Sequence, residues 1–236
     1  MTPESLQHAM DATWPAARLH EVGPWLIREG QGGGKRVSAA SARAAWQDGD
    51  IDLAEKAQID LGQERLFLIR KGDEALDQAL DRRGYRIVDP VIAYAIPCAD
   101  LAEPAPPAMA AFPHWPPLAI CRDIWAELGI SAARIRVMER AQGPKCAILA
   151  RTGDQPSGVA FVSVQGDVAM LHALEVREPM RRQGSAHNIL RRAANWALEN
   201  GAKTFSLVVT EANDPARKLY ASLNMQVVGQ YQYRLK

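Results

Sequence analysis

The chain has 236 residues, of which 47% are hydrophobic and 23% are charged, and its formal net charge at pH 7 is +1. These values are ordinary for a globular protein and give no electrostatic reason to expect binding to nucleic acid or to an anionic membrane. Residues 1–15 lack the basic and apolar regions of a secretory signal, and no apolar run is long enough to span a bilayer. We therefore expect a cytoplasmic protein, a monomer or homodimer, without nucleic-acid or membrane partners.

Three cysteines, Cys98, Cys121 and Cys146, are scattered along the chain without C-x-x-C or metal-ligand spacing. We interpret them as buried or incidental thiols in a reducing compartment. The sequence predicts no metal site.

The first part of the chain reads as alternating helices and strands. Apolar periodicity predicts helices over residues 3–12, 50–61 and 73–83, and strands over 25–28, 37–45, 65–70 and 85–96. Thr2 is placed to cap the first helix, with Pro3 at its first position. Gly84 is placed to end the third helix in the left-handed conformation.

A glycine-rich segment, residues 30–35, ends in Lys35 and is compatible with a phosphate loop. It lacks the G-K-[ST] ending and a following helix, so we interpret it as a hairpin connection. Nucleotide binding at this segment stays an alternative. It would require that ATP still bind to and protect the protein when Arg181 or Gly184 is substituted.

Composition divides the chain into an N-terminal part (1–98), a linker rich in proline and alanine (99–117) and a C-terminal part (118–236). In the last part we expect two helices, 118–128 and 131–141, and three antiparallel strands, 145–151, 158–165 and 168–176. A helix, a strand (205–210), a second helix (214–223) and an extended run (226–235) follow.

The most informative stretch is residues 171–195, where a strand passes through a basic turn of small residues into an amphipathic helix. The first N–H groups of a helix lack internal partners and carry partial positive charge. Gly184 permits close approach to the backbone, and Arg181 and Arg182 add forked donors for phosphate oxygens. The stretch predicts an anion-binding turn.

The pattern R-x-x-G-x-A at Arg181, Gly184 and Ala186 resembles the pyrophosphate loop of the GNAT superfamily of N-acetyltransferases. Asn213, Ala216 and Tyr220 lie in a segment similar to the superfamily's N-x-x-A-x-x-L-Y. The resemblance covers roughly the last half of the chain. It implies an α/β fold with a mixed sheet, the GNAT-like acyl-CoA N-acyltransferase fold.

The resemblance also implies acetyl-CoA as cosubstrate, with its pyrophosphate on the loop. Its pantetheine arm would lie along the edge of residues 174–176, where this strand and the strand at 205–210 part. Asn213 would contact the cosubstrate, or cap the following helix, or both. The implied binding residues are Leu174, Glu175, Val176, Arg181, Arg182, Gln183, Gly184, Ser185, Ala186, Asn213, Ala216 and Tyr220.

Two residues are candidates for the chemistry. Tyr220 matches the family tyrosine that protonates the departing thiolate, and the competing interpretation is an aromatic core residue. We select Glu175 as general base over Glu211 and His172. Strict strand alternation places His172 on the face opposite Glu175.

Residues 80–85 echo residues 219–225. We therefore interpret the N-terminal part as an incomplete copy of the same fold without a second cofactor loop, against the alternative of coincidence. Where the family commonly has Gly-Phe, this chain has Asn224-Met225. Asn is expected to tolerate the left-handed cap and Met to fill core space.

The sequence thus predicts an N-acetyltransferase that acts on a primary amine of a small molecule or peptide. The alternative is a non-catalytic acyl-CoA-binding regulatory protein, and the presence of Tyr220 with Asn213 favours the enzyme. The acceptor is not indicated. Four residues near the helix at 118–128 either line its cleft or only pack and solvate it: Trp115, Asp123, Trp125 and Glu127.

Overall fold

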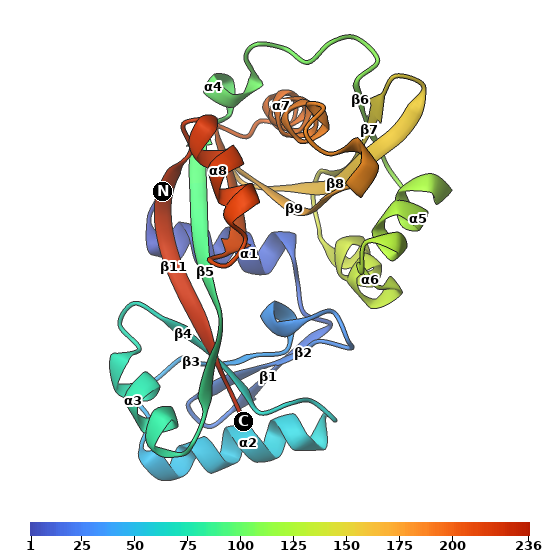
Figure 1. Cartoon of the computed structure of the whole chain (residues 1–236). Coiled ribbons are helices and arrows are strands. Elements are labelled where there is room, and N and C mark those ends of the chain that lie inside the picture. Colours follow the sequence, from blue (N-terminus) through green and yellow to red (C-terminus); the bar gives the residue numbers. More distant parts are fainter. The chain divides into compact units, whose positions relative to one another are not determined.

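The computed structural model describes all of residues 1–236, which form two units that interleave in the sequence (Figure 1). Unit 1 comprises Met1–Pro15, Ala93–Val208 and Lys218–Val228, and unit 2 comprises Ala16–Ile92, Val209–Arg217 and Gly229–Lys236. The sequence predicted three consecutive segments instead. Composition reveals local breaks, whereas these units depend on pairing between strands that are distant in the chain.

Unit 1 contains most of the C-terminal half. Its helices are α1 (Pro3–Thr13), α4 (Cys98–Ala102), α5 (Ala119–Glu127), α6 (Ala132–Arg140) and α7 (Ser185–Glu199). Its strands are β6 (Ala111–His114), β7 (Lys145–Thr152), β8 (Gln155–Gln165), β9 (Val168–Val176) and most of β10 (Thr204–Thr210). Strand β5 (Arg86–Pro97), helix α8 (Asp214–Ser222) and strand β11 (Gln226–Leu235) contribute residues to both units.

The strand order within unit 1 is β5-β10-β9-β8-β7-β6. Strands β6 to β9 are antiparallel neighbours, and β10 runs parallel to β9. The two predicted helices and three predicted strands of this region are therefore confirmed as α5, α6, β7, β8 and β9.

The predicted linker, 99–117, is not wholly irregular, because it contains part of α4 and all of β6. Strand β6 pairs with β7 from Ala111 opposite Ala150 to His114 opposite Ala147. It directly precedes α5, and the sequence did not predict it. The proline content concealed it: Pro113 lies in an edge strand, where a missing N–H is tolerated.

The two faces of the unit 1 sheet carry different helices. A Cβ added at Gly158 in β8 would lie 3.3 Å from Ile189 of α7, so this residue faces α7. Phe161, three residues along the same strand, faces the other side and contacts Trp14 just after α1. Helix α7 therefore covers one face, and α1 with α5 covers the other (Figure 1).

Unit 2 contains α2 (Ile51–Asp60), α3 (Glu74–Arg82), β1 (Arg18–Val22), β2 (Trp25–Glu29), β3 (Ala40–Ala42) and β4 (Leu66–Arg70). Its strand order is β1-β2-β3-β4-β11-β5. Strand β1 was not predicted, because it is largely exposed and Leu19 is 59% exposed. Of the strand predicted over 37–45, only β3 forms, preceded by a 3-10 turn over Lys35–Val37.

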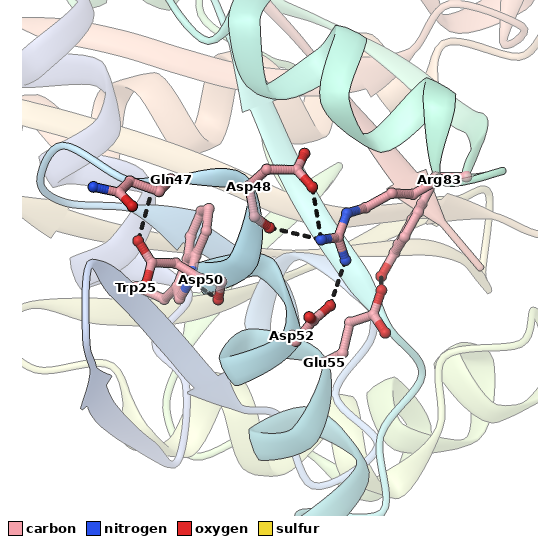
Figure 2. A network of polar contacts seen from close by, with 8 residues as sticks. Trp25, Gln47, Asp48, Asp50, Asp52, Glu55 and Arg83 are labelled. Atoms are coloured by element: carbon pink, nitrogen blue, oxygen red, sulfur yellow. Dashed lines mark hydrogen bonds and ion pairs between the residues drawn. The ribbon is translucent and has the colours of Figure 1, made fainter.

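A polar network ties the loop before α2 to β2 and to the end of α3 (Figure 2). The indole Nε1 of Trp25 donates to the Asp50 carbonyl at 2.6 Å. Figure 2 shows the Arg83 guanidinium between Asp48, at 2.9 Å, and Asp52. These hydrogen bonds raise the pKa of Arg83 and fix the first turn of α2.

Helices α3 and α8 end alike. Each is followed by a left-handed residue, the glycine before Tyr85 and Asn224 (φ +59°) before Met225. Tyr85 N then donates to Leu80 O at 3.0 Å, and Met225 N donates to Tyr220 O at 3.1 Å. The predicted tolerance of Asn224 for this cap is confirmed, and Leu80 accepts the capping hydrogen bond after α3 as Tyr220 does after α8.

None of the helices is long and apolar enough to cross a membrane.

Candidate active site

The turn between β9 and α7 has the geometry of an anion-binding loop. Arg182 (φ +63°) and Gly184 (φ +90°) both adopt left-handed conformations, which turn successive amides toward one side. The first helical bond of α7 is donated by Asn188 N to Gly184 O at 3.0 Å. The amides of residues 185–187, including that of Ala186, therefore precede the helical ladder and are available to a ligand.

Gly184 leaves an open space beside this loop. A Cβ built on Gly184 would meet no atom within 4 Å, and its φ of +90° disfavours any side chain. The loop therefore presents backbone rather than side chain on that side. Space, free amides and the positive end of α7 fit a phosphate group.

The side chain of Ser185 is engaged within the protein. Its side chain is only 2% exposed, and its hydroxyl donates to Ser157 Oγ and contacts Thr152 Oγ1, both at 2.9 Å. The hydroxyl chain anchors the start of α7 to β7 and β8, so only the Ser185 amide faces a ligand. Sequence analysis missed this anchor because Thr152 and Ser157 lie in other strands.

The arginines of the loop divide into two groups. Arg181 and Arg182 are exposed beside the loop, and Arg181 Nε donates to the Val176 carbonyl at 3.2 Å. Arg177, four residues before Arg181, instead binds Glu127 at 2.9 Å. Arg181 therefore connects the loop to the end of β9 while its guanidinium remains accessible.

Gln183 completes the loop through its own side chain. Its amide nitrogen Nε2 donates to the Pro179 carbonyl at 3.0 Å, which closes the turn between β9 and α7. The Gln183 backbone lies between the two left-handed residues.

Strands β9 and β10 part before the end of β9, as the resemblance implied. Their pairing runs from Val168 opposite Thr204 to Leu171 opposite Leu207 and stops there. Residues 174–176 pair only with β8. One edge of this segment therefore has the geometry to accept an added strand or an extended amide ligand.

A β-bulge lies where the two strands part. Ala173 and Leu174 together oppose the single residue Ala160, and Ala173 has a φ of +49°. His172 pairs with Phe161, and Glu175 pairs with Val159.

The bulge overturns the predicted alternation along β9. Phe161 and Val159 are two residues apart in a regular strand and share a face, so their partners His172 and Glu175 share it too. The sequence placed them on opposite faces. Because of the extra residue at Ala173, each later side chain of β9 lies on the face opposite to the one that regular alternation predicts.

Glu175 and Tyr220 interact electrostatically. Burial raises the pKa of Glu175, and the positive charges of Arg134 and Arg181 oppose the increase. Burial also raises the pKa of Tyr220, to which the negative charge of Glu175 and nearby Tyr94 add. Tyr220 is 5% exposed, and its ring centroid lies 5.6 Å from that of Tyr94. The phenol is therefore held in its protonated form.

The other two base candidates are engaged elsewhere. His172 is buried, contacts Thr13 Oγ1 through Nε2 at 2.9 Å and lies 4.9 Å from the Trp14 ring. Glu211 belongs to unit 2, where its side chain is exposed and its backbone N donates to Pro90 O. Of the three carboxylate or imidazole groups considered, Glu175 is the one whose charge raises the pKa of Tyr220.

Asn213 and Ala216 lie in the segment of unit 2 that enters α8. Asn213 Oδ1 accepts from Ala216 N at 3.2 Å, so the predicted capping of the helix by Asn213 is confirmed. This hydrogen bond explains the spacing of the two residues.

The four aromatic and acidic residues predicted near the acceptor cleft have separate environments. Trp125 is 0% exposed, and Glu127 pairs with Arg177. The ring of Trp115 lies 5.7 Å from that of Phe161 and beneath the ammonium of Lys145. Trp125 therefore packs in the core and does not line a cleft.

Residues 114–225 match the model of the acetyltransferase (GNAT) family. The chain is 28% identical over 236 residues to the uncharacterized N-acetyltransferase YobR of Bacillus subtilis (strain 168), with 95% of each chain covered. A GCN5-related N-acetyltransferase from Kribbella flavida aligns with a TM-score of 0.70 at 18% identity, over 99% of this chain and 93% of that one. A tandem GNAT protein from the clavulanic acid biosynthesis pathway aligns with a TM-score of 0.55 at 12% identity, over 84% and 74%. At these identities the two solved structures share the fold alone.

Proposed function

We propose that this chain, whose residues 114–225 match the model of the acetyltransferase (GNAT) family, transfers an acetyl group from acetyl-CoA to a primary amine of a small molecule or peptide. The proposal rests on three features of β9 taken together. The strand parts from β10, bulges at Ala173 and leads into the anion-binding loop at 181–186.

The donor would lie along this path. Amides of residues 183–186, with Arg181 and Arg182, would hold the pyrophosphate. The backbone of Leu174, Glu175 and Val176 would pair with the amides of the pantetheine arm. Asn213 and Ala216 are further proposed contacts, on the strength of the motif that they share with the family.

The chemistry divides between two side chains. Glu175, whose burial raises its pKa, would take a proton from the acceptor ammonium, directly or through water. The free amine would attack the thioester carbonyl carbon, and a backbone N–H of β9 would stabilise the oxyanion. As the C–S bond breaks, Tyr220 would donate its phenolic proton to the thiolate, and the extra proton on the acylated nitrogen would pass to the tyrosinate, directly or through water.

A non-catalytic acyl-CoA-binding protein is the second candidate. It would need the loop at 181–186, but it would need neither a buried carboxylate nor a phenol beside it. The proximity of Glu175 to Tyr220 favours the enzyme.

Amine-dependent release of CoA tests the proposal. The full chain is incubated with acetyl-CoA and a panel of small-molecule and peptide amines, and free thiol is measured against the background without acceptor. We expect saturable, acceptor-dependent thiol release, with mass spectrometry showing the acetylated amine. Saturable acetyl-CoA binding without transfer to any acceptor would instead support the binding protein.

A further inference from the structure

One buried side chain outside the family motifs contacts the backbone of the proposed site. Trp125, in α5, donates from its indole Nε1 to the carbonyl oxygen of Ala173 at 2.9 Å. The ring is 0% exposed, so water does not compete for the donor. We infer that Trp125 is a positioning residue whose N–H holds the β9 bulge and thereby keeps Glu175 on the face of the sheet that it shares with His172. The inference rests on the proposed function for its kinetic consequences.

The hydrogen bond favours the bulged strand over a flat one. Ala173 adopts a φ of +49°, which disfavours residues with a Cβ, so the bulge requires compensation. A bulge also removes its extra residue from the ladder with the neighbouring strand, and a buried carbonyl left without a donor is costly. The indole has a donor and no acceptor, which suits a carbonyl.

The bulge determines which face Glu175 occupies. With it, Glu175 pairs with Val159 and lies on the face of the sheet that Phe161 and His172 share. A regular strand would move Glu175 to the face covered by α7, because one residue fewer inverts the alternation. Trp125 therefore acts on the proposed base indirectly, by holding the bulge that decides which face of the sheet Glu175 occupies.

Trp125→Phe removes the donor and keeps most of the ring. We expect kcat to fall about tenfold, the rate equivalent of one net hydrogen bond, while the KM for acetyl-CoA changes little. The acidic limb of the kcat/KM profile should move to lower pH, because a less buried Glu175 loses the desolvation that raises its pKa. Arg134, Arg181 and Tyr220 are the charged or titratable groups that face Glu175.

Trp25→Phe is the matched control. Trp25 is also 0% exposed and donates to a backbone carbonyl, that of Asp50 at 2.6 Å, but it lies in unit 2 (Figure 2). We expect it to lower stability without changing the pH profile. If both variants alter the profile alike, the inference is wrong.

Two changes at Ala173 test the bulge independently of the tryptophan. Ala173→Gly relieves the positive φ, so in the Trp125→Phe background it should restore most of the lost kcat. Ala173→Val opposes that φ and should reproduce the loss with Trp125 intact, which keeps the inference testable if Trp125→Phe does not fold. A Trp125→Phe enzyme with the kcat and pH profile of wild type, or one that glycine does not rescue, would overturn the inference.

Hydrogen exchange separates this inference from the proposed function. In wild type the indole N–H of Trp125 should exchange slowly, and in Trp125→Phe the backbone amides of residues 172–176 should exchange faster than in Trp25→Phe. If wild type transfers no acetyl group but these differences hold, the proposed function fails and the structural part of the inference stands. If wild type is active and β9 exchange is unaffected, the inference alone fails.

Discussion

The negative charge of Glu175 reaches the buried phenol of Tyr220 and adds to the burial that raises the pKa of that phenol. The two residues are 45 positions apart in the sequence, and a β-bulge at Ala173 places Glu175 on the same face of the sheet as His172. A carboxylate able to accept a proton therefore acts electrostatically on a hydroxyl that is able to donate one. That pairing is what an acyl transfer from a thioester to an amine requires.

Replacing Glu175 by Gln should lower kcat/KM by about 10²–10⁴, the usual contribution of a general base. A base acts in its deprotonated form, so wild-type activity should fall as the pH drops through the raised pKa of Glu175. This acidic limb should lie above the ordinary carboxyl value of 4.5 and be absent from Glu175→Gln. Steady-state rates between pH 5 and 9 measure it.

The control for that experiment is Asp154→Asn, which removes a carboxylate from an exposed turn. The Asp154 side chain is 98% exposed and pairs only with Arg151 among the charged groups. It should leave the profile unchanged. A Glu175→Gln enzyme that retains the acidic limb would mean that another group is the base.

Replacing Tyr220 by Phe should leave acetyl-CoA binding unchanged and lower kcat by about 10²-fold, because general-acid assistance to the thiolate is lost. Phenylalanine keeps the packing against Tyr94, so stability should change little. Tyr94→Phe, at the neighbouring ring, is the comparison and should retain turnover. Equal turnover in wild type and Tyr220→Phe would exclude Tyr220 as the proton donor.

Replacing Asp77 by Asn should lower the free energy of unfolding by about 1–2 kcal/mol at pH 7, because it weakens a partly buried ion pair while Asp81 still pairs with Arg234. Arg234 is 5% exposed and donates to Asp77 Oδ1 at 2.7 Å and Oδ2 at 3.0 Å. Asp52→Asn, which weakens the more exposed pair with Arg83, should cost less than about 1 kcal/mol. Urea unfolding followed by tryptophan fluorescence measures both.

The effect of Asp77 should depend on pH with a defined sign. Hydrogen bonds from Arg234 lower the pKa of Asp77, so the folded state binds its proton less readily than the unfolded chain. The stabilisation is present in full above the unfolded value of about 4 and is lost as the pH falls through the folded pKa. The difference between wild type and Asp77→Asn should therefore shrink below about pH 4. A constant difference would contradict this account.

The sequence predicted the elements that are determined by residues close together in the chain. The loop at Arg181–Gly184, the N-cap at Asn213 and the left-handed cap at Asn224 each follow from side-chain and backbone preferences within a few residues. Most helices and strands of the C-terminal half follow from hydrophobic periodicity in the same way.

The features that were missed depend on partners distant in the sequence. The bulge places Ala173 at a positive φ, and nothing about an alanine in an apolar strand indicates this conformation. It is fixed by pairing around Ala160 and by the indole of Trp125. The hydroxyl chain from Ser185 to Ser157 likewise joins a helix to a strand that periodicity alone does not place beside it.

The account depends most on the loop at 181–186 as the site of acetyl-CoA binding, and calorimetric titration of Gly184→Glu tests this directly. The control is Gly201→Glu, at the other end of α7, because Gly201 has a similar φ of +84° and equally open surroundings. We predict saturable binding to wild type and Gly201→Glu, and none to Gly184→Glu, whose carboxylate would occupy the pyrophosphate position. Unchanged acetyl-CoA affinity in Gly184→Glu would contradict the account.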